Sequence, residues 1–144
     1  MGYGRTMKPA AMPVRAAAVV VDGVFVFIVL GAAVGVATGE THRASFSLHG
    51  WAAVAWIVLS FGYWIGCERL WGMTIGKRLF SIRVIGEGGA KPTWRQSLVR
   101  NLMRLVDGFP YILPYLLGFI VAETSYQRRR IGDHLAATHV VPRD

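Results

Sequence analysis

Arg15 and Asp22 are the first residues in the chain whose types and spacing suggest chemistry. They are two helical turns apart, so a helix places both on one face with the small Ala18 between them. A carboxylate within a bilayer costs about 3 kcal/mol unless a cation or a proton neutralises it, and such residues are candidates for ion or proton transport. The alternative is that Asp22 forms an ion pair that only fixes helix packing.

Two further aspartates, Asp107 and Asp133, extend this set. Asp107 ends a predicted amphipathic helix whose polar side carries Arg100 and Arg104, so we expect it to make a local contact with an arginine one turn earlier. Asp133 follows a run of arginines that is too charged to enter lipid, whereas residues 135–141 are apolar enough to pack against protein. We therefore expect the tail of the chain to fold back.

The composition indicates a membrane protein. Of the 144 residues 53% are hydrophobic and 17% are charged, and the mean hydropathy of +0.41 is high for a soluble domain of this size. The net charge is +8, but the basic residues flank apolar stretches, which argues against nucleic-acid binding. No nucleophile and base stand at a plausible spacing, so we expect no enzyme.

Two apolar stretches are long enough to cross a bilayer. Residues 16–37 have Asp22 as their only ionisable group and extend roughly 33 Å as a helix, longer than the core of a secretory signal peptide. A polar loop at 38–49 leads to residues 50–67, which contain no acid or base and carry aromatic residues toward both ends, as membrane anchors do. We expect both stretches to be transmembrane helices.

A basic region, residues 68–107, precedes a third apolar segment. Imperfect alternation at 79–85 followed by glycines predicts a strand and a turn, and a later helical period predicts an amphipathic helix at the interface. The apolar residues 108–122 include two prolines and extend only about 22 Å as a helix. This segment is either re-entrant or a span that borrows residues from the preceding helix.

The distribution of basic residues predicts the orientation. With residues 1–15 in the cytoplasm, two spans and a re-entrant segment place every Lys and Arg except Arg43 inside, whereas a third span would export the basic residues of the tail at 123–144. The predicted fold is an all-α integral membrane protein in one domain, residues 1–144. It has two transmembrane helices, a third Pro-containing membrane-embedded segment, an amphipathic interfacial helix and a short cytoplasmic β-hairpin-like element.

Four pieces of the sequence, in this order, are similar to the RDD family of small bacterial membrane proteins. They are Arg15-x-x-Ala18-x-x-x-Asp22, the stretch from Trp71 to Ile85 with Gly76-Lys77-Arg78, the stretch from Ser97 to Asp107, and Arg130-Ile-Gly-Asp133-x-Leu-Ala-x-Thr138. The resemblance covers nearly the whole chain. Ala137 departs from it, because the family often has glycine at this position. The arginine and two aspartates of the family name map to Arg15, Asp22 and Asp133, with Asp107 as the competitor for the last.

The resemblance implies a bacterial inner-membrane protein for which transport of ions or small solutes is the usual proposal. Together with the residue pattern it predicts an intramembrane charge cluster of Arg15, Asp22 and Asp133, supported by further basic residues, namely Arg100, Arg104 and Arg130. One arginine between two carboxylates leaves one negative charge. A proton or an alkali cation would neutralise this charge, and exchange between the two would be the elementary transport step.

An accessory or assembly subunit of a larger membrane complex is the alternative function. Glycines recur every four residues on both predicted helices and suit close helix contact; they include Gly31, Gly35, Gly62 and Gly66. So few helices predict either a homo-oligomer or a partner protein, and the basic region favours contact with anionic lipid headgroups. The histidines are not spaced for a metal site and no phosphate-cradling loop is complete, so we expect neither metal nor cofactor.

Overall fold

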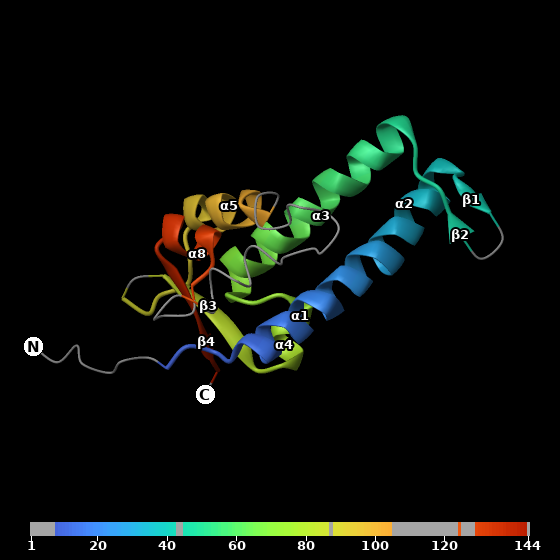
Figure 1. Ribbon diagram of the computed structural model, residues 1–144. Helices are drawn as coiled ribbons and strands as arrows, with labels where there is room; N and C mark the ends of the chain where they lie inside the picture. Colours follow the sequence, from blue (N-terminus) through green and yellow to red (C-terminus); the bar gives the residue numbers. More distant parts are fainter. Residues whose placement is uncertain (1–7, 43–44, 87, 105–123, 125–128, 144) are drawn as a thin grey trace, which may run out of the picture.

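The computed structural model describes residues 8–42, 45–86, 88–104, 124 and 129–143. In chain order, the elements are α1 (Met12–Val24), η1 (Phe25–Leu30), α2 (Gly31–Thr38), β1 (Thr41–His42), β2 (Ser45–Phe46), α3 (Gly50–Trp71), α4 (Ile75–Leu79), β3 (Ile82–Gly86), α5 (Trp94–Leu102), α8 (Ile131–Leu135) and β4 (Thr138–Pro142). Two long helical rods run antiparallel to each other, and the shorter elements gather mainly at one end of the pair (Figure 1).

The first rod is continuous from Met12 to Thr38 and the second from Gly50 to Trp71, and these 27 and 22 residues are long and apolar enough to cross a membrane. Pro13 lies at the start of the first rod, where its missing N–H costs no hydrogen bond. Gly39, at φ 75°, ends that rod in the left-handed conformation that glycine tolerates best. Both rods are longer than the predicted spans, residues 16–37 and 50–67.

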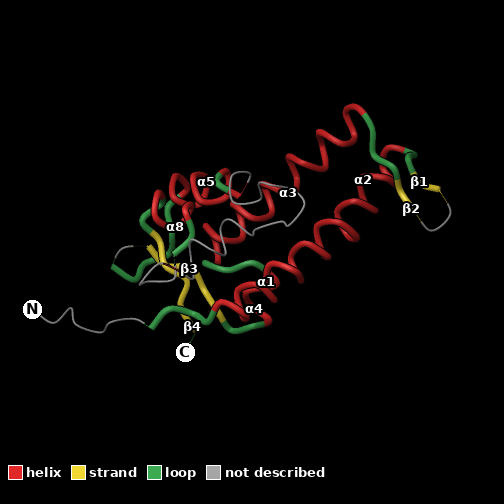
Figure 2. Tube along the Cα trace, in the orientation of Figure 1, coloured by secondary structure: helices red, strands yellow, loops and turns green. Residues whose placement is uncertain are grey.

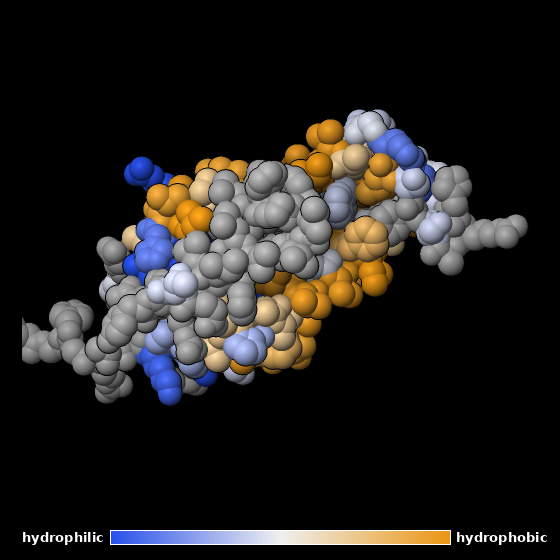
Figure 3. All heavy atoms as spheres, viewed as in Figure 1, coloured by the Kyte–Doolittle hydropathy of each residue, from blue (hydrophilic) through white to orange (hydrophobic). Residues whose placement is uncertain are grey.

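The two rods contact each other through aromatic residues. The indole N–H of Trp56 donates to the carbonyl oxygen of Val26 at 3.1 Å, within the π-helical segment η1. The rings of Phe25 and Tyr63 lie 5.0 Å apart between centroids. Many of the remaining apolar side chains on the rods are exposed, and the space-filling view shows an apolar surface over the middle of the helix pair, with polar residues toward both ends (Figure 3).

The elements at one end of the rods form a unit that we name the end module: α4, β3, α5, α8 and β4. Strands β3 and β4 pair antiparallel, from Ile82 opposite Pro142 to Gly86 opposite Thr138 (Figure 2). A small apolar core joins this sheet to the start of α1; it consists of Ala10, Ala18, Ile82, Val84 and Val140, with Val14 and Phe80 packed against it. The end module therefore docks on the first rod.

The sheet of the end module differs from the predicted β-hairpin-like element. The predicted strand is present as β3, but it pairs with β4 from the C-terminal tail instead of with a neighbouring segment. The tail folds back, as the apolar residues 135–141 predict, because Val140 and Val141 are buried against the protein. A helix, α5, lies where the amphipathic helix was predicted, and it begins at a capping box formed by Thr93 and Gln96. Its location at a membrane interface stays a prediction. Asp107 and the third segment, 108–122, lie outside the described residues.

Ala137 connects α8 to β4 with φ at +50°, a conformation that costs a residue with a Cβ about 1 to 2 kcal/mol. We expect Ala137→Gly to stabilise the protein by roughly 1 kcal/mol, after the greater freedom of glycine in the unfolded chain is subtracted. Denaturant unfolding in detergent measures this difference. Ala136→Gly, at a neighbouring position with an ordinary φ, serves as the control and should destabilise.

Candidate functional site

Asp133 lies at the centre of three arginines. Its carboxylate accepts a hydrogen bond from Arg15 at 2.5 Å and another from Arg100 at 2.5 Å, and the guanidinium of Arg130 lies 4.0 Å away. The backbone N–H of Arg130 also donates to it at 3.2 Å. Asp133 is only 1% exposed. The ion pairs of Asp133 with Arg15 and Arg100 bring the start of the first rod, α5 and α8 together.

Glu68 forms a second centre of charge one helical turn before the end of α3. Its carboxylate accepts hydrogen bonds from the ammonium of Lys77 and, at 3.0 Å, from the side-chain amide of Asn101. Arg100 Nε lies 3.1 Å from one oxygen and Arg104 Nη2 lies 3.9 Å from the other. Glu68 is completely buried, so each of these cations compensates a charge that water cannot reach.

Arg100 joins the two centres, since its guanidinium contacts Glu68 and Asp133 and also donates to Thr138 Oγ1 at 3.2 Å. We name the whole set the charge cluster. All of its residues are buried; they are Arg15, Glu68, Lys77, Arg100, Arg104, Arg130 and Asp133. The residues come from α1, α3, α4, α5, α8 and the adjoining loops, so the cluster holds the end module and the rods together.

The arginines control the ionisation of Asp133. Burial raises the pKa of its carboxyl, but the nearby guanidinium groups of Arg100, Arg15 and Arg130 lower it by more. The net result is a pKa well below the ordinary value for aspartate. Asp133 therefore stays ionised throughout the physiological pH range.

The pKa of Lys77 is lowered, whereas an ion pair with a carboxylate at an exposed position would raise it. Burial, together with the positive charges of Arg100 and Arg104, lowers the pKa of its ammonium from 10.5 to about 7, although Glu68 opposes this shift. The unfolded chain therefore binds more protons than the folded chain between these two values. Stability should rise with pH over this window.

We expect this rise in unfolding free energy between about pH 7 and pH 10 to be smaller in Lys77→Gln than in the unaltered protein. Lys8→Gln, at an exposed position, is the control and should retain the full slope. The measurement is denaturant unfolding in detergent at several pH values. Equal slopes in the protein with and without Lys77 would contradict the prediction.

Asp22 has different partners from those predicted. Its carboxylate accepts hydrogen bonds from Tyr63 Oη at 2.9 Å, Thr74 Oγ1 at 2.5 Å and the backbone N–H of Gly76 at 2.8 Å. These donors are neutral groups from α3 and from the start of α4. The described contacts of Asp22 therefore fasten α4 to the first rod through neutral donors, whereas the packing interpretation predicted an ion pair.

The predicted site residues that the structure describes fall into two separate networks. Arg15, Arg100, Arg130 and Asp133 come together, Arg104 joins them through Glu68, and Asp22 stands in a separate hydrogen-bond network. Sequence reasoning missed Glu68 and Lys77, because both fall in a region whose basic character suggested solvent. The signal for Glu68 was an isolated acid directly after the last residue of the second apolar stretch, Cys67.

The helix-packing glycines are also divided. Gly31 and Gly35 are buried in α2, whereas a Cβ added at Gly62 or Gly66 of α3 would meet nothing within 4 Å. Within the part of the chain that the structure describes, no three His, Cys, Asp or Glu side chains gather in a way that could hold a metal ion. The described site consists of buried ion pairs.

A mostly helical chain with two membrane-length apolar helices and charges buried at one end of them defines a membrane protein. The family model for the RDD family matches residues 9–137, and the chain belongs to this family. The match includes Arg15, Asp22 and Asp133, so the resemblance seen in the sequence is confirmed. No curated protein and no solved structure matches the chain.

Proposed function

We propose that this RDD protein transports or exchanges ions or small solutes across the bacterial inner membrane, without catalysing a reaction, and that the charge cluster is its working site. The observation that carries the proposal is the burial of seven charged side chains where two apolar helices meet the end module. Buried charges in membrane proteins are costly and commonly mark the path of an ion or a proton. A permanently paired structural cluster is the competing explanation.

The charge balance of the cluster differs from the sequence-based prediction. Among the described residues, five basic groups surround two carboxylates, which gives 5 − 2 = +3 with Lys77 protonated. An alkali cation would be repelled by this surplus. The balance favours an anion as the exchanged species. Lys77, with a pKa of about 7, is the group of the cluster best suited to bind and release a proton during the exchange.

Arg104 is the residue of the cluster best placed to receive an anion. Its Nε, Nη1 and Nη2 atoms are buried and make no hydrogen bond within the described part of the chain. The guanidinium lies 4.6 Å from the centroid of the Trp64 ring and 3.9 Å from Glu68. Buried N–H donors without acceptors cost about 1 to 3 kcal/mol each, so an incoming anion that accepts these bonds would be favoured.

Flux measurements on the full chain in proteoliposomes test the proposal, with chloride and phosphate gradients as the first probes. Replacement of Arg104 by Gln should lower the anion flux about 10- to 100-fold, the effect of losing a charged hydrogen-bond donor. Arg95→Gln removes the same charge from an exposed position on α5 and should leave the flux unchanged. Full flux in a folded Arg104→Gln protein, or flux of alkali cations alone, would contradict the proposal.

An accessory subunit remains the second candidate, and the open face around Gly62 and Gly66 favours it. The native mass of the particle extracted in mild detergent separates the two functions. A particle that contains only copies of this 15.8 kDa chain supports a homo-oligomeric transporter. A particle with other proteins in fixed ratio, lost on Gly62→Leu, supports the accessory function.

A further inference from the structure

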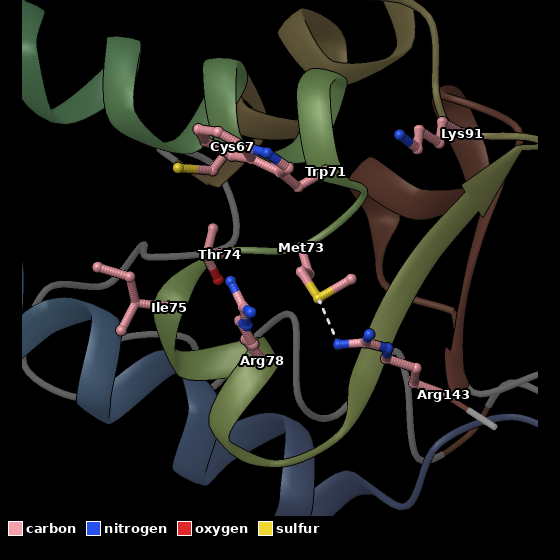
Figure 4. Close-up of a pocket in the computed structure, with 8 residues that line it drawn as sticks. All are labelled: Cys67, Trp71, Met73, Thr74, Ile75, Arg78, Lys91 and Arg143. Carbon is pink, nitrogen blue, oxygen red and sulfur yellow. Dashed lines mark hydrogen bonds between the residues drawn. The ribbon is translucent and has the colours of Figure 1, made fainter.

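A second feature lies outside the charge cluster, at the junction of α3, α4 and the ends of the β3–β4 sheet. It is a cavity of about 460 Å³, within the range of small-molecule sites, lined by Cys67, Trp71, Met73, Thr74, Ile75, Arg78, Lys91 and Arg143. Figure 4 shows basic side chains that enter it from different sides: Arg78 from α4, Lys91 from the loop after β3, and Arg143 from beyond β4. Among the residues that the structure describes, the lining includes no acidic one.

The basic side chains of this cavity carry no counter-charge among the described residues. Lys91 donates to the carbonyl oxygen of Leu70 at 2.9 Å, and Arg143 contacts the sulfur of Met73 at 3.8 Å. The side chain of Arg78 is exposed and makes no hydrogen bond or ion pair within the described part of the chain. A concave site with three uncompensated cations favours a ligand with concentrated negative charge, and a phosphate group matches this requirement.

Part of the cavity border is apolar and lies at the end of a membrane-length helix. Trp71 is 59% exposed and Ile75 is 46% exposed, and both line the cavity beside the exposed Leu70. A tryptophan at the end of such a helix suits the headgroup level of a bilayer. The cavity therefore offers basic side chains for a phosphate and an apolar border for attached chains.

We propose that this cavity binds an anionic phospholipid, with the headgroup phosphate held by Arg78, Lys91 and Arg143 and the acyl chains directed along Trp71 and Ile75. Basic pockets beside membrane helices bind such headgroups in the same manner. The site shares no residue with the charge cluster. Lipid binding and anion flux can therefore fail independently of each other.

Native mass spectrometry of the full chain in a neutral detergent tests the proposal, with phosphatidylglycerol and phosphatidylcholine as probes. The double variant Arg78→Gln/Lys91→Gln should reduce the affinity for phosphatidylglycerol about thirtyfold. The matched control Lys8→Gln/Arg95→Gln removes the same charge from exposed positions outside the cavity and should change the affinity less than about twofold. Equal losses in the two variants would overturn the proposal in favour of attraction by net charge.

Cys67 localises the binding, because it lines the cavity and is the only cysteine in the chain. Phosphatidylglycerol should slow its alkylation by a maleimide several-fold, whereas phosphatidylcholine and inorganic phosphate should not. The double variant should lose this protection. Unchanged alkylation in the presence of bound phosphatidylglycerol would place the lipid elsewhere and overturn the proposal. Equal protection by inorganic phosphate alone would overturn the proposal and indicate that the cavity binds a free phosphate instead of a lipid.

Discussion

Asp133→Asn is expected to destabilise the protein by about 3 to 5 kcal/mol, the cost of removing one partner from a buried ion pair. Asparagine has nearly the same shape as aspartate, so the expected loss is electrostatic and not a packing defect. Without the carboxylate, Arg15, Arg100 and Arg130 remain buried around a neutral group. The free energy of unfolding in detergent at pH 7 measures the effect.

Two further variants distinguish this effect from a general loss of charge. Glu40→Gln removes a carboxylate that lies 3.8 Å from an exposed His49 ring, and it should cost less than about 1 kcal/mol. Adding Arg15→Gln to Asp133→Asn removes one of the cations that surround position 133 and should recover part of the lost stability. An Asp133→Asn protein as stable as Glu40→Gln would show that the pairs around Asp133 contribute little.

The same pairs predict the behaviour in acid. Because the pKa of Asp133 is lowered on folding, its contribution is fully present above the pKa of an unfolded aspartate, about 4, and is lost as the pH falls below that value. Asp133→Asn should therefore flatten the acid limb of the stability profile.

Gly76→Ala is expected to have a comparably large effect, about 3 kcal/mol, at the upper end of the usual cost of overpacking. A Cβ at this position would lie 2.1 Å from the backbone oxygen of Ala18 and 3.0 Å from Cγ of Asp22. No side-chain rotation relieves a contact with backbone, so α4 would have to move away from the first rod. That movement would also break the hydrogen bond from the Gly76 N–H to Asp22.

Gly62→Ala is the matched control, because a Cβ there meets nothing within 4 Å and alanine is the better helix former. It should leave stability unchanged or raise it by up to about 1 kcal/mol. Unfolding in detergent measures the difference in stability. Hydrogen exchange of the backbone N–H at position 76 reports whether this group still donates to Asp22. Similar stabilities of Gly76→Ala and Gly62→Ala would contradict the described approach of α4 to the first rod.

The amino-acid sequence alone predicted the two apolar helices, the strand before the glycine-rich turn and a helix after that turn. These are local properties: the length of an apolar run decides whether it can cross a bilayer, and periodicity decides its secondary structure. The motifs that resemble the RDD family were likewise contiguous, and the family match confirms them. The second helix begins at the predicted residue but continues past Cys67 to Trp71, because the polar side chains that follow the apolar stretch find partners.

Those partners were decided by the tertiary structure. Arg15 and Asp133 are 118 positions apart, and Asp22 and Gly76 are 54 positions apart, so nothing in the local pattern assigns either pair. The spacing of Arg15 and Asp22 on one helix face predicted that they share a cluster, yet Asp22 is occupied by hydrogen-bond donors of α3 and α4. Glu68 became the second centre of charge because α3 extends to Trp71 and carries it inward. Charge and hydropathy are properties of each residue and can be read from the sequence, whereas the pairing of buried charges depends on which distant segments the fold brings together.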